Sequence, residues 1–273
     1  MYDRMILIDK PAGMTSFSVV ARVRRVLSKV AGRKIKVGHT GTLDPFATGL
    51  LILMAGKYTK RCQEFLKLDK RYTATIRLGA TSTTGDVEGE IHEVVTKGTT
   101  FPGRVPRARL HGARALMLGS DLRIARESSP LSHAAALRSP FEKGFIDFAS
   151  VQSVVKSFEG EIRQRVPAFS AVKIGGVRAY KLARKGEKVE MPERTVTIYE
   201  INIIDYKWPY LKIDAKVSSG TYIRTLGEDI GEKLGVGGYL TELVRTEIGE
   251  YKLEDAIPLE DFMKNEELLL EQS

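Results

Sequence analysis

The residue types that can do chemistry in this chain gather between Gly38 and Leu51. This segment reads GHTGTLDPFATGLL and holds three glycines, three threonines and one acid, Asp44, directly before an apolar run. Glycines let the backbone approach a ligand closely, and Pro45 biases Asp44 towards an extended backbone. A carboxylate held on such a turn can act as a base, a metal ligand or a nucleophile. Asp and Gly are also common turn formers, so the residues alone favour an Asp that caps its own loop.

Other kinds of catalytic or cofactor site lack their usual sequence patterns. The four histidines are scattered, without a ligand pair at i and i+4 or a cluster of carboxylates, so a metal site is a poor alternative. The G-x-S-x-G motif of serine hydrolases does not occur. Neither a P-loop nor a G-x-G-x-x-G motif is present. We therefore expect no metal and no other cofactor.

Length and composition are those of a globular protein. The chain has 273 residues, of which 42% are hydrophobic and 28% charged, enough for one large domain or two small ones. No run of about 18 apolar residues predicts a membrane-spanning helix. The N-terminus lacks the apolar stretch of a secretory signal. A single cysteine, Cys62, excludes an intramolecular disulfide and a Cys-rich zinc site. We expect a cytoplasmic protein.

Charge is unevenly distributed along the chain. The formal net charge is +9, but residues 254–273 contribute seven acids and one lysine, so the remaining residues carry +15. Such a basic body favours a polyanionic partner, as expected of a surface that follows phosphates. A solvated basic face explains the same charge equally well.

Hydrophobic periodicity predicts the elements that must position Asp44. A buried strand is expected at residues 5–8 and another at residues 50–54. Between them, apolar residues from Val19 to Val30 recur at helical spacing, and Thr15 or Ser16 can cap that helix. Further helices are expected at residues 57–68, 150–158, 180–185 and 220–234, and further strands at residues 72–78, 91–95, 196–204, 211–217 and 242–248.

Strands in this order follow one another directly as well as alternating with helices. This favours an α+β fold with a mixed or antiparallel sheet over a doubly wound parallel one. Residues 97–144 hold four prolines, many Arg and Ser residues and weak periodicity, which indicates an inserted, partly ordered arm or a disordered linker. We expect one domain at residues 1–253, interrupted by a basic insertion at about 97–144, and an acidic C-terminal tail at 254–273.

Six blocks of sequence resemble, in order, the motifs of the TruB family, the tRNA pseudouridine-55 synthases. The block around Asp44 is similar to the family's catalytic motif and is the most specific. The resemblance covers the chain except residues 97–144 and the tail. The other five blocks are D-K-P-A-G-M-T-S at 9–16, K-R-Y at 70–72, P-A-F-S-A-V-K at 167–173, G-T-Y-I-R-T at 220–225 and L-V-R at 243–245.

The resemblance implies a pseudouridine synthase fold, with a mixed, mainly antiparallel sheet, flanking helices and a central active-site cleft. It also implies the activity. The family isomerises a uridine in the TΨC loop of tRNA by breaking the C1′–N1 bond, turning the uracil and rejoining it through C5, without a cofactor. Because that base is stacked in a folded loop, it must be flipped into a pocket.

Three catalytic roles follow from the resemblance. Asp44 matches the nucleophile, which must be ionised and close to C1′ or C6 of the nucleotide. Arg224 matches the arginine that keeps this carboxylate charged in a buried place. Tyr72 matches the pocket tyrosine, whose ring can stack on the uracil and whose hydroxyl can assist proton removal from C5. Without the resemblance, Tyr72 is better explained as a core residue and Arg224 as a surface one.

Five substrate-binding residues are implied in the same way. Tyr222 and Leu243 match positions that line the base pocket, and His39 matches the histidine that stacks on the displaced loop nucleotides. Lys10 is expected to support the site, and Lys173 to support it or to contact a phosphate. Taken alone, these residues are ordinary core, turn or solvated side chains.

The expected partner is the T-arm of tRNA, with no membrane, no guide RNA and no protein partner. Many family members continue into a C-terminal RNA-binding domain, which bears on tRNA affinity more than on chemistry. One alternative is a non-catalytic RNA-binding or RNA-folding protein that uses the same cleft. Another is a pseudouridine synthase that needs a guide RNA.

Overall fold

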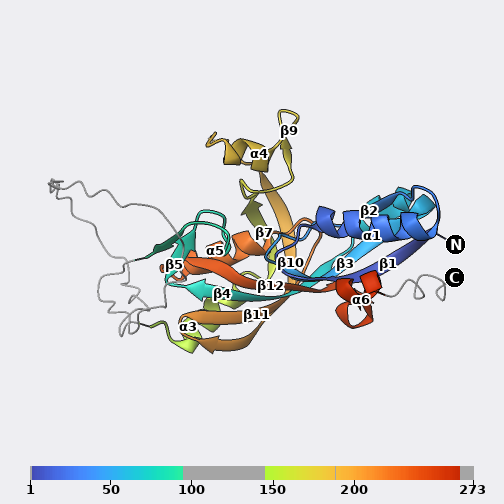
Figure 1. Ribbon diagram of the computed structural model, residues 1–273. Helices are drawn as coiled ribbons and strands as arrows, with labels where there is room; N and C mark the ends of the chain where they lie inside the picture. Colours follow the sequence, from blue (N-terminus) through green and yellow to red (C-terminus); the bar gives the residue numbers. More distant parts are fainter. Residues whose placement is uncertain (1, 95–144, 188, 265–273) are drawn as a thin grey trace, which may run out of the picture.

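A long mixed sheet forms the frame of the protein. The computed structural model describes residues 2–94, 145–187 and 189–264. In this part of the chain, ten strands form one sheet with the order β14-β1-β3-β12-β4-β11-β10-β7, while β2 pairs with β3 and β13 with β12. Only the β1–β14 and β3–β12 pairs of this sheet are parallel. The sheet runs the length of the molecule (Figure 1). The α+β class with a mixed, mainly antiparallel sheet is therefore confirmed.

The described residues form fourteen strands, six α-helices and two 3-10 helices. The strands are β1 (Arg4–Lys10), β2 (Val37–His39), β3 (Thr48–Ala55), β4 (Lys70–Leu78), β5 (Ala80–Ser82), β6 (Ile91–Glu93), β7 (Gly160–Arg165), β8 (Lys173–Ile174), β9 (Val177–Arg178), β10 (Glu193–Lys207), β11 (Tyr210–Val217), β12 (Gly238–Ile248), β13 (Tyr251–Lys252) and β14 (Ile257–Pro258). The helices are α1 (Ser16–Val30), η1 (Gly56–Arg61), α2 (Cys62–Leu66), α3 (Phe148–Lys156), α4 (Ala179–Arg184), α5 (Ile223–Lys233), η2 (Leu253–Asp255) and α6 (Leu259–Lys264).

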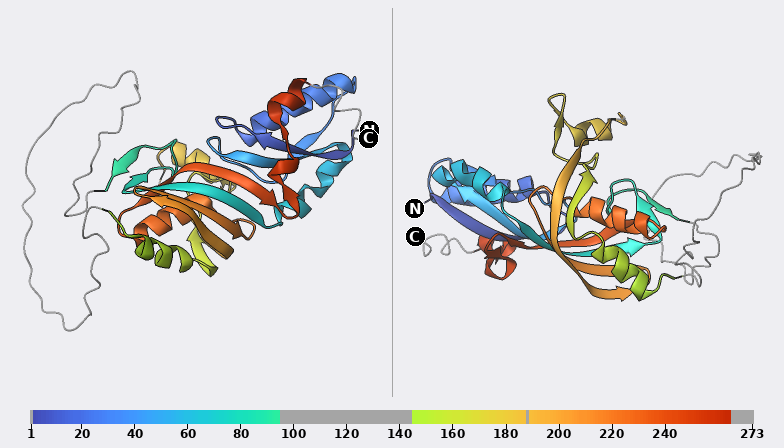
Figure 2. Two further views of the ribbon diagram at one scale, coloured as in Figure 1. Left: turned by 90° about the horizontal axis from the view of Figure 1, so that it is seen from below. Right: turned by 180° about the vertical axis from the view of Figure 1, so that it is seen from behind.

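The N-terminal half of the sheet is covered on both faces, which explains the continuous burial of β3. Side chains of β1 and β3 pack on one face against α1 and α6, which lie beside each other when viewed from below (Figure 2). Helix α1 forms as expected because its apolar residues recur at helical spacing and the Thr15 hydroxyl accepts the N–H of Ser18 at 3.0 Å. On the other face, Leu50, Ile52 and Met54 pack against Phe65 of α2.

The C-terminal half of the sheet has its own core. Alternate residues of β4, β11 and β12 pack against α5 and α3. The hairpin of β8 and β9, with α4, projects from the sheet on the side that carries α1 and α5 (Figures 1 and 2). The two cores meet where β3 pairs with β12, through Thr48 opposite Val244 and Gly49 opposite Arg245.

Some local expectations differ from the structure. The helix expected at residues 57–68 is a 3-10 helix followed by a short α-helix. Helix α3 begins before Ser150, because Asp147 caps it and accepts the Ser150 N–H at 2.9 Å. Strand β7 and the β8–β9 hairpin were not expected, since their short, mostly exposed sequences lack a clear alternation of apolar residues.

The segment expected as an acidic tail contributes to the fold. Residues 254–264 supply β14, which pairs with β1, and α6, whose Leu259 and Phe262 are buried beside α1. Its acids lie on the opposite, solvent-facing side of α6, so charge alone did not reveal the two buried residues. The insertion expected at about 97–144 and residues 265–273 lie outside the described residues.

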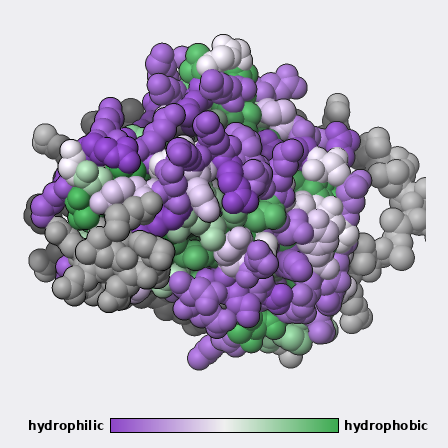
Figure 3. All heavy atoms as spheres, turned by 90° about the vertical axis from the view of Figure 1, so that its right-hand side faces the viewer, coloured by the Kyte–Doolittle hydropathy of each residue, from purple (hydrophilic) through white to green (hydrophobic). Residues whose placement is uncertain are grey.

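The surface on the α1 and α6 side is mainly hydrophilic, with small separate apolar patches (Figure 3). In the described part of the chain, no helix has the length and apolar character needed to cross a bilayer.

The burial of Phe262 gives a stability prediction. Phe262→Ala should lower the free energy of unfolding by about 3–5 kcal/mol, because it removes a fully packed ring from the N-terminal core. Urea unfolding measures the change, and Glu260→Ala, at an exposed position on the same helix, serves as the control. Equal stability of the two variants would show that α6 does not belong to the core.

Candidate active site

A cavity of about 310 Å³ lies above the C-terminal half of the sheet. It is lined by the turn at residues 41–44, by residues of β4, β11 and β12, by residues 169–171 and by residues 220–224. The sheet forms its floor, since Tyr72 stands opposite Arg245 on one neighbouring strand and Ala215 on the other. Three loop segments and three strands thus meet around one space, and Asp44 belongs to its wall.

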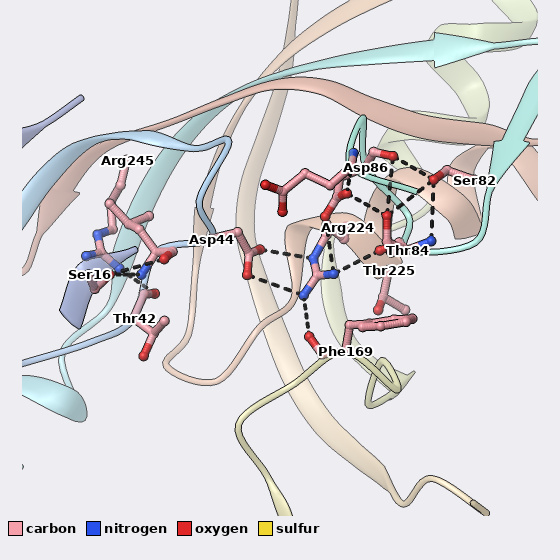
Figure 4. Close-up of polar contacts among 12 residues, drawn as sticks. Ser16, Thr42, Asp44, Ser82, Thr84, Asp86, Phe169, Arg224, Thr225 and Arg245 are labelled. Carbon is pink, nitrogen blue, oxygen red and sulfur yellow. Dashed lines mark hydrogen bonds and ion pairs between the residues drawn. The ribbon is translucent and has the colours of Figure 1, made fainter. Parts of the chain in front are cut away.

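Asp44 is held by a two-point contact with Arg224. The Nε of Arg224 lies 3.0 Å from Oδ2 of Asp44, and its Nη2 donates to Oδ1 at 3.4 Å (Figure 4). This fork geometry is the strong form of a carboxylate–guanidinium pair. The Asp44 side chain is 31% exposed whereas that of Arg224 is only 5% exposed, so a ligand in the cavity can reach the carboxylate but not the back of the guanidinium.

The rest of the Arg224 guanidinium is fixed by three further acceptors. Nη1 donates to the carbonyl of Thr84 at 2.8 Å and lies 3.3 Å from Oδ2 of Asp86, while Nη2 donates to the carbonyl of Phe169 at 2.9 Å (Figure 4). Asp86 is itself buried, with a side chain only 3% exposed. One guanidinium is therefore shared by two carboxylates on opposite sides.

Asp86 was not among the residues singled out from the sequence. It lies in the polar turn at residues 81–89, between the strands expected at residues 72–78 and 91–95. Its carboxylate accepts the Thr84 hydroxyl at 2.6 Å and the N–H of Glu88 at 3.0 Å. A signal was present, because a single Asp among Thr, Ser and Gly residues is the same composition that drew attention to Asp44.

The pKa of Asp44 reflects two opposing influences. Burial raises the pKa of the carboxyl above its usual value, and the Arg224 guanidinium opposes this by stabilising the charged form. Asp86 raises it further, since a second negative charge stands behind the same arginine. Burial similarly raises the pKa of nearby Glu228 to about 7. Arg224 is thus the group that makes ionised Asp44 possible in this place.

The backbone of the Asp44 turn is held by Lys10 and Ser16. The buried Lys10 ammonium donates to the carbonyls of Pro11 at 2.9 Å, Met14 at 2.6 Å and Pro45 at 3.2 Å. The Ser16 hydroxyl donates to the carbonyl of Leu43 at 3.1 Å and accepts the Leu43 N–H at 2.8 Å. Lys10 therefore holds main-chain carbonyls on both sides of the turn, and it is not among the residues that line the cavity.

The other side of the turn is held by Arg245, which is 1% exposed. It donates to the carbonyl of Leu50 at 2.8 Å and to that of Gly41 at 3.1 Å. Its own backbone lies against Gly49, where φ is +99° and an added Cβ would stand 2.4 Å from the Arg245 carbonyl oxygen. Only glycine fits here, so β3 and β12 can pair closely beside the turn.

Five of the residues singled out from the sequence lie in one cavity: Asp44, Tyr72, Tyr222, Arg224 and Leu243 all line it. Tyr72 and Leu243 belong to the sheet floor, on strands β4 and β12.

Tyr222 precedes α5, where buried Gln164 clamps its backbone by accepting its N–H at 3.0 Å and donating to its carbonyl at 3.2 Å. The cavity also contains Ser170, whose buried hydroxyl has no hydrogen-bond partner among the described residues.

The other three residues, Lys10, His39 and Lys173, do not line this cavity. His39 ends β2, and its Nδ1 accepts the N–H of Gly41 at 3.3 Å; burial lowers its pKa. Lys173 begins the β8–β9 hairpin and lines a second, larger hollow of about 950 Å³ together with Arg163 and Arg165. Within the described residues, no group of three or more His, Cys, Asp or Glu side chains can hold a metal ion.

An ionisable aspartate on a Gly-rich turn, a guanidinium partner and an aromatic-lined cavity over a mixed sheet are together the arrangement of a pseudouridine synthase. Comparison with known proteins gives the family. The model of the TruB family pseudouridylate synthase N-terminal domain matches residues 24–104 and 132–223, and that of the tRNA pseudouridylate synthase B C-terminal domain matches residues 224–272. The chain belongs to the TruB family.

Individual relatives agree with this assignment. The tRNA pseudouridine synthase B of Phocaeicola vulgatus is 39% identical over 94% of this chain and 91% of its own length. That of Corynebacterium diphtheriae is 40% identical over 96% of this chain and 72% of its own length.

Solved structures give the same fold. An H/ACA ribonucleoprotein bound to a substrate RNA containing 2′-deoxyuridine contains a chain that is 25% identical, with a TM-score of 0.57. A chain of an archaeal box H/ACA complex is also 25% identical, with a TM-score of 0.58. Each comparison covers 98% of this chain but only 55% of the other.

The raised pKa of Asp44 predicts a cost in stability. Between the usual aspartate pKa and the raised one, the folded state binds more protons than the unfolded state, so this group lowers stability as pH rises through that range. At neutral pH Asp44→Asn should therefore unfold at a higher urea concentration than the unchanged protein. The difference should vanish below the usual aspartate pKa, where both states are protonated.

Asp205→Asn, at an exposed position on β10, is the matched control and should show no such pH-dependent gain. A destabilised Asp44→Asn variant at neutral pH would mean that the pairing with Arg224 outweighs the burial of the carboxylate.

Proposed function

We propose that this protein isomerises uridine to pseudouridine at position 55 in the TΨC loop of tRNA, with Asp44 as the nucleophile. The observation that carries the proposal is the two-point Asp44–Arg224 contact inside a cavity large enough for a flipped pyrimidine. Membership of the TruB family and relatives named tRNA pseudouridine synthase B support the reaction and the substrate class.

The chemistry follows from the position of each group. Attack of ionised Asp44 at C1′ bonds it to the sugar and releases the uracil as its anion as the C1′–N1 bond breaks. Attack at C6 instead bonds Asp44 to the uracil, which stays attached to it when the C1′–N1 bond breaks. The uracil turns, C5 bonds to C1′, the bond to Asp44 breaks, C5 loses its proton and N1 gains one. Tyr72, on the cavity floor, stacks on the base and assists the removal of the C5 proton. Tyr222 and Leu243 hold the ring while it turns.

Arg224 contributes by remaining charged throughout. Its guanidinium keeps Asp44 ionised before the reaction and orients the carboxylate towards the cavity. Asp86, Thr84 and Phe169 hold the guanidinium from behind, so it cannot follow Asp44 into the cavity. Lys10 fixes the turn that carries Asp44. His39, at the end of β2, is assigned to stacking on loop nucleotides, and Lys173, beside Arg163 and Arg165, to contact with a phosphate.

The partner in this proposal is the T-arm of tRNA, read without a guide RNA or a protein partner, in the cytoplasm. The basic charge of residues 1–253 suits a phosphate backbone. The relatives that share most of their length with this chain are named for tRNA, whereas the H/ACA chains are nearly twice as long.

The main test replaces the nucleophile. Asp44→Asn should abolish pseudouridine formation while leaving tRNA binding nearly unchanged, because the amide keeps the shape of the side chain but cannot act as a nucleophile. Tritium release from unmodified tRNA that carries 5-tritiated uridine measures the reaction, and Asp205→Asn is the control. Product formed by the Asn variant at the normal rate would defeat the assignment.

The same assay separates the alternatives. Tritium release from a bare tRNA transcript by the unchanged protein excludes a need for guide RNA. Tight binding without any release, in contrast, would identify a non-catalytic RNA-binding protein.

A second prediction concerns the residue behind the arginine. Asp86→Asn should lower kcat on the order of a hundredfold with little change in KM, because Arg224 loses its charged partner among the three acceptors that hold it behind Asp44, and Asp44 is misplaced. Single-turnover tritium release measures the chemical step. Glu90→Gln, an exposed position in the neighbouring turn, should keep full activity. A normal rate for Asp86→Asn would show that Thr84 and Phe169 suffice to hold Arg224.

A further inference from the structure

Two buried cations lie on the floor of the same cavity. Lys70 on β4 is 7% exposed, Arg245 on β12 is 1% exposed, and both line the cavity that contains Asp44. Arg245 stands opposite Tyr72, and Lys70 lies two residues before Tyr72 on the same face of β4. The two cations are therefore neighbours on one surface, next to the ring assigned to the base.

Neither cation is neutralised by a carboxylate in the described part of the chain. The Lys70 ammonium donates to the carbonyls of Leu66, at 2.8 Å, and Leu68. Arg245 donates only to main-chain carbonyls, those of Gly41, Thr42 and Leu50. An ammonium has three N–H donors and a guanidinium five, so at least one on Lys70 and two on Arg245 remain unused.

Two like charges side by side in a buried place are unfavourable without an anion. Burial, together with the neighbouring Arg245, lowers the pKa of Lys70 to about 8. Asp69 is the acid that opposes this change, but it forms no ion pair with Lys70 in the described structure. The stabilising anion is therefore missing from the described residues around this pair.

The part of the cavity wall that holds Asp44 carries the opposite charge. There Asp44 and Asp86 share one guanidinium, that of Arg224, which leaves a net negative charge. Asp44 projects between Arg245 and Arg224 in Figure 4. The floor beside the cations is formed by Tyr72, Leu243 and Val217, which are aromatic or apolar. A ligand that fits this pattern has a flat neutral group joined to an anionic one.

We propose that Lys70 and Arg245 bind a backbone phosphate directly next to the target uridine. The proposal rests on the proposed function, since it takes an RNA strand as the ligand. With the base over Tyr72 and the phosphate on the two cations, the sugar between them is fixed in position, and C1′ is presented to Asp44. This contact predicts that an RNA strand binds better than a free nucleoside, because the nucleoside lacks the phosphate.

The test couples one protein charge to one RNA charge. Binding is measured by fluorescence anisotropy in the Asp44→Asn protein, so no turnover is involved, with T-arm stem-loops that carry a single uncharged methylphosphonate. Replacing the phosphate on one side of the target uridine should weaken binding about tenfold. Lys70→Met should weaken binding to unmodified RNA by about the same factor, and the two changes together should cost no more than either alone.

Two control variants test whether the effect depends on a positive charge at position 70. Lys67, three residues before Lys70, is exposed and does not line the cavity. Lys67→Met should therefore leave the methylphosphonate effect intact. Lys70→Arg, which preserves the charge, should retain the effect. If Lys70→Met does not fold, the methylphosphonate scan on the Asp44→Asn protein and on Lys70→Arg still tests whether a phosphate beside the uridine is bound, because it changes only the RNA.

Additive effects of Lys70→Met and the methylphosphonate would overturn the proposal. So would equal binding of RNAs neutralised beside the uridine and in the distal stem, since the cations would then serve only to hold loops. Either result with normal tritium release by the unchanged protein leaves the proposed function standing. Non-additive effects of Lys70→Met and the methylphosphonate, without tritium release by the unchanged protein, would refute the proposed isomerase activity but support the phosphate site.

Discussion

The contact between Arg224 and two carboxylates is the interaction on which the rest of the site depends. A carboxylate in a largely dry wall tends to take up a proton, and only a nearby fixed positive charge prevents this. Arg224 supplies that charge because its guanidinium is pinned by Asp86, Thr84 and Phe169 on the sides that do not face Asp44. The raised pKa of Asp44 indicates that its ionised form costs stability, and Arg224 offsets part of that cost.

Main-chain contacts hold the turn so that the Asp44 carboxylate lies next to the Arg224 guanidinium. Lys10, Ser16 and Arg245 all bind main-chain groups of the turn or of its flanks, so the position of the carboxylate is set by backbone contacts on both sides. These contacts join the N-terminal core to the C-terminal one at the place where β3 and β12 pair. The same contacts therefore fix both the position of Asp44 and the junction of the two halves of the sheet.

Much of this was predictable because regular patterns report local structure. The valines of α1, the apolar run of β3 and the alternation in β11 each gave an element that the structure contains. The β8–β9 hairpin was not predicted, since two-residue strands have no period to detect. Residues 254–264 were assigned to a tail because their many acids obscured Leu259 and Phe262, which are buried only when α1 is beside them.

By itself, the sequence determined the chemical inventory: one aspartate on a Gly-rich turn, a chain of family motifs, and the elements that bear them. The tertiary structure decided which of these groups meet. Asp44 and Arg224 are 180 residues apart, and their contact depends on the order and register of strands between them. Asp86 and the Lys70–Arg245 pair gain their significance only from such contacts, because the burial that makes a charge matter is a property of the folded surroundings.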